Sequence, residues 1–199
     1  PIQWPAVSTN TVRADAILNE LAAVLARNIG NNSASLLGQN VGGAAKVEFV
    51  QDADEPTMRL RLFEERAKAS VAHALEKDGF VLWQEAPKYG IFYAAFAPKE
   101  EGFFSALFGD DVPETPKHDL TAVLQHLSSS EAAKRTFGDM PGVAHGPALK
   151  DAVGLLVVMS PSSKTPENAM DVIVRDVRGE KLPAVHAKQV LRILRKNLI

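Results

Sequence analysis

The sequence contains no cysteine, and this absence excludes several kinds of chemistry at once. Disulfides, thiolate metal sites, iron–sulfur clusters and cysteine nucleophiles all require that residue. The chain also has no apolar run approaching the roughly 18 residues that a membrane-spanning helix needs. Its charge is nearly balanced, with 22 basic and 24 acidic residues, so the composition does not indicate a nucleic-acid-binding protein.

The sequence patterns of common enzyme classes are missing as well. No P-loop, GxGxxG, GxSxG or HExxH motif occurs. His118 and His126 would lie about 12 Å apart along a helix, which is too far for one metal ion. The segment 160–164 (SPSSK) leaves a serine–lysine hydrolase open as a third and weakest hypothesis, but a solvated turn explains it better. We therefore expect no enzyme, no metal ion and no cofactor.

The N-terminal part of the chain divides into an arm and a linker. Apolar residues recur at helical spacing in 1–29 and predict a helical arm, which can be interpreted as the remnant of a preceding domain. Residues 30–56 are rich in glycine and small polar residues and indicate a linker, although the alternation in 46–50 predicts a short strand within it. The chain begins with proline and shows no signal-peptide pattern, so we expect a processed chain or part of a longer one.

The remainder, 57–199, is predicted to be the main domain. Alternating apolar residues indicate strands, a nearly continuous apolar run indicates a central strand, and spacing of three to four residues indicates helices. The expected strands cover 58–62, 80–84, 91–96, 153–159 and 170–174, and the expected helices cover 64–77 and 183–198. Arg59 and Arg61 should point to solvent from the first of these strands. A turn at 87–90 makes a hairpin of the second and third strands.

An insert at about 100–151 interrupts this pattern. It predicts helices over 118–127 and from Ser130 onward, with Ser130 as a helix cap, followed by a loop over 140–148. The chain is thus expected to be α+β, of the helix-grip type: an antiparallel sheet packed on a long C-terminal helix, with a helical insert and with the helices on one face of the sheet.

Three segments resemble one protein family. They are MRLRLFEERAKASVAHALEKDGFVLWQEAPKYGIFYAAF at 58–96, PKEEGFFSALFGDD at 98–111 and DVIVRDVRGEKLPAVHAKQVLRILRKNLI at 171–199. Together they are similar to the C-terminal helix-grip domain of the BamC (NlpB/DapX) lipoprotein family. Two features depart from the family pattern: the stretch 112–151 is longer than expected, and residues 1–56 hold neither a full first grip domain nor the segment through which the family engages BamD.

The resemblance implies a non-catalytic accessory lipoprotein module of the outer-membrane β-barrel assembly machinery. The implied partners are BamD and BamA-like components, and nucleic acid is not among them. The implied location is the periplasmic side of the outer membrane, with surface exposure also compatible, and the only membrane attachment would be a lipid anchor upstream of this chain. The alternative is a small-molecule or lipid carrier with an apolar cavity between the sheet and the C-terminal helix.

The insert contains the candidate partner-binding residues. Phe103, Phe104, Leu107 and Phe108 form an apolar cluster that is either an exposed hook for a partner or a short helix folded over the sheet. Our hypothesis combines this cluster with the groove between the final helix and the sheet. The final helix also carries the cations Lys188, Arg192, Arg195 and Lys196, for which a solvated helix face is the simplest interpretation.

Overall fold

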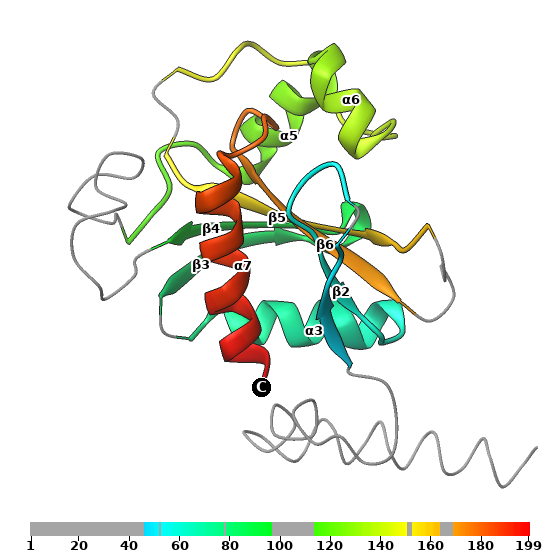
Figure 1. The fold of residues 1–199 in the computed structure, drawn as a ribbon. Coiled ribbons are helices and arrows are strands. Elements are labelled where there is room, and N and C mark those ends of the chain that lie inside the picture. The colour runs from blue at the N-terminus through cyan, green and yellow to red at the C-terminus, as the bar shows by residue number, and fades with distance from the viewer. Residues whose placement is uncertain (1–45, 52, 78, 97–113, 151–152, 164–168) are drawn as a thin grey trace, which may run out of the picture.

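The computed structural model describes residues 46–51, 53–77, 79–96, 114–150, 153–163 and 169–199 (Figure 1). Over these residues the chain is α+β, with a six-stranded antiparallel sheet and four helices, the last of which packs on the sheet. The sheet order is β1-β2-β6-β5-β4-β3. The strands are β1 (Val47–Phe49), β2 (Met58–Leu60), β3 (Phe80–Ala86), β4 (Ile91–Phe96), β5 (Leu155–Pro161) and β6 (Met170–Asp176). The helices are α3 (Glu64–Leu75), α5 (Leu120–Ser129), α6 (Glu131–Phe137) and α7 (Ala184–Leu198), with a 3-10 turn, η1 (Pro87–Tyr89), between β3 and β4.

The middle of the sheet is apolar on both faces. β5 lies between β4 and β6, which confirms the prediction of a central strand. Because successive side chains of a strand point to opposite faces, Leu155 and Val157 enter one core while Leu156 and Val158 enter another. A strand that is buried on both faces needs a covering layer on each side.

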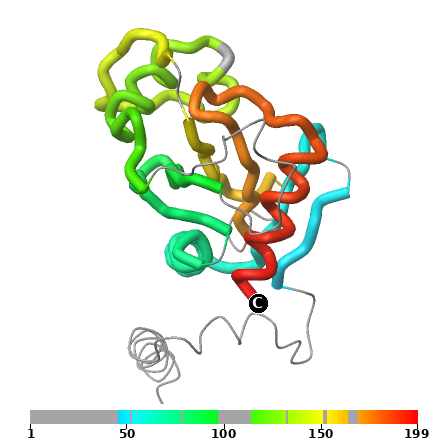
Figure 2. The backbone as a smooth tube through the Cα atoms, turned by 90° about the vertical axis from the view of Figure 1, so that its left-hand side faces the viewer, coloured from blue at the N-terminus to red at the C-terminus, as the bar shows by residue number. Residues whose placement is uncertain are grey.

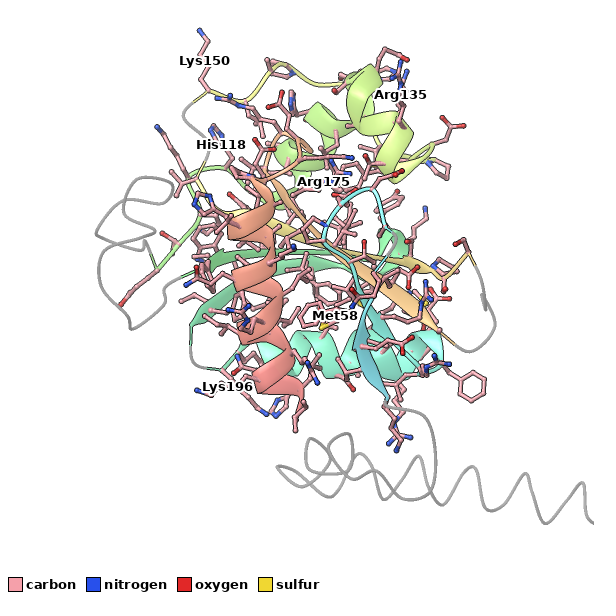
Figure 3. The ribbon with its side chains drawn as sticks, viewed as in Figure 1. Met58, His118, Arg135, Lys150, Arg175 and Lys196 are labelled. Atoms are coloured by element: carbon pink, nitrogen blue, oxygen red, sulfur yellow. The ribbon has the colours of Figure 1, made fainter. Side chains whose placement is uncertain are left out.

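Helices α3 and α7 form the layer on one face. Their apolar sides meet the sheet in the larger core, where Met58 of β2 is also fully buried (Figure 3). In α7 the spacing of Val190, Leu191 and Leu194 places all three against the sheet with no exposed surface. The prediction of a long, amphipathic final helix is therefore confirmed.

Helices α5 and α6 form the layer on the other face. The carboxylate of Asp119 accepts a hydrogen bond from the amide of Ala122 at 2.8 Å and begins α5. The hydroxyl of Ser130 accepts one from the amide of Ala133 at 3.3 Å and begins α6, as predicted. Figures 1 and 2 show these helices above the sheet and α3 below it. The expectation that all helices lie on one face was wrong, because β4 and β5 have two apolar faces and the insert supplies the second cover.

One predicted strand is confirmed, and one boundary differs from that expected. The short strand predicted over 46–50, inside the range 30–56 assigned to a linker, is β1. It pairs with β2, so the sheet begins before residue 57. At the other end, Ser160 and Pro161 belong to β5 and pair with β6 rather than starting a loop. Proline is tolerated at this point because a strand end does not need every ladder hydrogen bond.

None of the helices within the described ranges has both the length and the apolar character that crossing a membrane requires.

Candidate partner-binding surface beside the last helix

A surface pocket lies between the β1–β2 loop, residues 50–57, and the N-terminal half of α7. In Figure 1 the loop is the cyan arch beside the upper part of the red helix. The pocket has a volume of about 390 Å³. The residues that line it are Phe49, Val50, Gln51, Ala53, Asp54, Glu55, Pro56, Thr57, Ala184, Lys188 and Arg192. The cavity is therefore walled by one loop and by two turns of one helix.

Contacts at the base of the loop and an ion pair of Glu55 hold the loop in position. The amide of Val50 donates to the carbonyl of Thr57 at 2.9 Å and closes the loop at its base. The hydroxyl of Thr57 donates to the carbonyl of Glu55, also at 2.9 Å. The carboxylate of Glu55 forms an ion pair with Arg175 of β6, whose side chain is 7% exposed (Figure 3). These contacts hold the pocket wall in place before any partner arrives, which lowers the entropic cost of binding.

A second ion pair stabilises the neighbouring part of the sheet. The guanidinium of Arg59 donates two hydrogen bonds to the carboxylate of Asp171, at 2.7 and 2.9 Å. These hydrogen bonds raise the pKa of Arg59, against the opposing effect of its burial. The alternation in β2 predicted a solvent-facing Arg59. That expectation was wrong, because the partner on β6 allows the guanidinium to be buried.

The outward face of α7 carries four cations, Lys188, Arg192, Arg195 and Lys196, which we call the α7 stripe. All four are exposed, and the helix contains no acidic residue. At 3.6 residues per turn the four positions fall within an arc of about 100°. Lys188 and Arg192 are one turn apart and form one wall of the pocket. The guanidinium of Arg195 lies over the ring of Phe49, 5.6 Å from its centroid, and ties β1 to the helix.

The predicted partner-binding cluster of Phe103, Phe104, Leu107 and Phe108 lies outside the described residues. Buried side chains of α7 fill the space between the final helix and the sheet, where a groove was expected. The pocket lies at the surface, between α7 and residues 50–57. Sequence reasoning missed this pocket because it assigned the loop to a linker. The one local signal was the acidic, proline-containing stretch 50–57 next to a short alternating strand.

Several residues weighed for metal binding or catalysis make structural contacts in the parts of the chain that the structure covers. No group of three or more histidine or acidic side chains there could hold a metal ion. The ring of His118 bonds the backbone carbonyl of Lys150 at 2.9 Å, which ties the insert to its own return segment. Ser162 is fully buried, and its amide donates to Ala169, which is a structural role for the stretch considered as a hydrolase motif.

The tyrosine of the second core is also engaged. The hydroxyl of Tyr93 donates to the carbonyl of Val153 at 3.0 Å, and its ring meets Trp83 edge-on with the centroids 4.9 Å apart. Burial raises the pKa of Tyr93 to about 12, so the phenol stays neutral at physiological pH. Trp83 and Tyr93 thus anchor the insert layer and do not form an exposed stacking platform.

A comparison of the chain with protein-family models found no match, and a search among curated proteins found none either.

Proposed function

We propose that this chain is a non-catalytic accessory module that acts through protein–protein contacts, in the manner that its resemblance to the BamC family suggests. The proposed setting is the outer-membrane β-barrel assembly machinery, with BamD or a BamA-like component as the partner. The proposed attachment is a lipid anchor upstream of residue 1, with the domain on the periplasmic side of the outer membrane.

One observation carries the proposal that the module works by binding. It is the preformed pocket beside α7, whose helix wall carries Lys188 and Arg192 and whose loop wall is fastened to Arg175. A concave, partly apolar surface with a few well-placed polar groups is the usual form of a recognition site. The described walls of the pocket present charged side chains and backbone groups, and such groups favour binding over catalysis.

The carrier alternative has less support. It requires an apolar cavity between α7 and the sheet, whereas the described interior there is occupied by side chains such as Val190, Leu191 and Leu194, which are fully buried. Close packing of this kind leaves no room for a lipid without displacing the helix.

The test is an affinity pull-down from detergent-solubilised envelopes of the native host. This chain and a version with its native upstream sequence serve as baits, and BamA and BamD are detected with antibodies. Retention by both baits would support a partner surface within these 199 residues. Retention by the longer bait alone would place docking upstream and leave this chain as an accessory domain. Retention by neither would refute the proposed setting.

A further inference from the structure

The outward face of α7 carries more positive charge than the helix dipole and ion pairs within the helix explain. Cations in the last turn of a helix interact favourably with the helix dipole, which accounts for Arg195 and Lys196. The effect falls off within one turn of the terminus, so it does not account for Lys188 and Arg192. Nor does the helix offer them acidic neighbours at the spacing of three or four residues that would form ion pairs.

Several cations elsewhere in the described structure form ion pairs. Arg59 and Arg175 have buried carboxylate partners. Arg61 bonds Glu48 at 2.9 Å, and Lys68 bonds Glu64 at 2.6 Å. Among the described residues, none of the four side chains of the α7 stripe forms an ion pair. The stripe is thus a positively charged surface that forms no ion pair with the described part of the chain.

Two cations of the stripe, Lys188 and Arg192, line a concave part of the surface. The carboxylate of Glu55 in the loop already forms an ion pair with Arg175. Asp54 remains exposed at the rim of the pocket. Phe49 and Pro56 supply apolar wall against which the methylene groups of a glutamate side chain can pack. The planar guanidinium of Arg192 suits a carboxylate because it can donate two parallel hydrogen bonds.

From these observations we infer that the pocket and the α7 stripe bind an acidic segment of a partner protein, with one carboxylate side chain in the pocket between Lys188 and Arg192. The rest of the segment follows the helix past Arg195 to Lys196. This inference deepens the proposed function and rests on it only for the identity of the partner, which would be the component of the assembly machinery that carries the segment.

A protein segment fits this surface better than an anionic membrane does. A bilayer presents a broad negative surface that would contact the whole edge of the pocket and repel the carboxylate of Asp54. An extended peptide needs to bring only one carboxylate into the pocket that Asp54 lines, and it can place the others along the stripe. The concavity of the pocket also favours an inserted side chain over a flat layer of head groups.

The experiment measures binding of a fluorescein-labelled peptide in which glutamate alternates with serine and glycine, by fluorescence anisotropy. The test variant is K188E/R192E. The matched control is R135E/K150E, which makes the same change in formal charge on the insert side of the molecule, where Figure 3 labels both residues. Both control residues are exposed, and α6 packs on the opposite face of the sheet from α7.

We expect K188E/R192E to bind the peptide at least about tenfold more weakly than the wild-type chain, and the control to stay within about threefold. The charge-retaining variant K188R/R192K should keep most of the affinity, and all variants should give the wild-type circular dichroism spectrum. An equal loss in test and control variants would overturn the inference, because binding would then depend on net charge alone. Failure of the wild-type chain to bind, or binding to phosphatidylglycerol vesicles but not to the peptide, would overturn it too.

The pull-down described above separates this inference from the proposed function. If K188E/R192E retains BamA or BamD as well as the wild-type chain does, the proposed function stands and the inference fails. If the peptide binds through Lys188 and Arg192 but neither component is retained, the acidic-segment site stands and the proposed partner fails.

Discussion

The ion pair between Glu55 and Arg175 is the contact on which the pocket depends most, and removing its charge gives a quantitative test. In E55Q the amide oxygen can still accept a hydrogen bond from Arg175, but the charge is lost. A hydrogen bond to a charged group contributes about 1.5–3 kcal/mol. The two side chains are only 7% and 18% exposed, so solvent screens the pair little. We therefore expect E55Q to lower the free energy of unfolding by about 1.5–3 kcal/mol and E55A by about 3 kcal/mol or more.

The chain offers a matched control in a second glutamate–arginine pair. Glu48 and Arg61 are 34% and 43% exposed, so E48Q should cost less than about 1 kcal/mol. The assay is urea unfolding followed by circular dichroism at neutral pH. Replacing both members of the buried pair with apolar residues, as in E55L/R175M, should cost less than E55A alone, because no charge is left buried without a partner. An E55Q variant no less stable than E48Q would refute the argument that this pair fastens the loop.

Three further predictions address the cores and the insert. L194A should lower the free energy of unfolding by about 2–5 kcal/mol in urea unfolding, because Leu194 is fully buried beneath α7. Y93F should cost about 0.5–1.5 kcal/mol through the lost bond to Val153. The pKa of Tyr93 rises from 10.0 to about 12, so the wild-type chain should hold this contribution below about pH 10 and lose it as the pH rises through about 12, while Y93F should show a weaker alkaline loss in a stability profile. F104S/F108S should weaken capture of the partner in the pull-down without lowering the unfolding midpoint, whereas loss of the fold would show that these residues belong to the core.

The parts of the fold that depend on local pattern were predictable from the sequence. The alternation around Met58 and the apolar run that became β5 gave strands where the structure has them. The spacing of apolar residues in 183–198 gave α7, and Ser130 was identified as a cap because a hydroxyl before a helix can satisfy a free amide. Each of these signals lies within a window shorter than about 18 residues.

The features that were missed depend on contacts between distant segments. Arg59 is buried because Asp171, 112 positions later, neutralises it. The loop 50–57 forms a pocket wall because Glu55 binds Arg175, 120 positions away. Local composition cannot report such pairings, so a segment that looks like a linker can become a fixed wall. The position of α5 and α6 on the second face of the sheet was missed for the same reason, since it follows from tertiary packing and not from their own periodicity.

We propose that the α7 surface contacts a component of the β-barrel assembly machinery, and site-specific photo-crosslinking in the native envelope can detect this contact. The chain, expressed with its native upstream sequence, would carry a photo-reactive phenylalanine analogue at Lys188 or, as the control, at Arg135. We expect a crosslinked species containing BamA or BamD from position 188 and none from position 135. A crosslink from position 135 alone, or none from either position while the chain is present in the envelope, would contradict it.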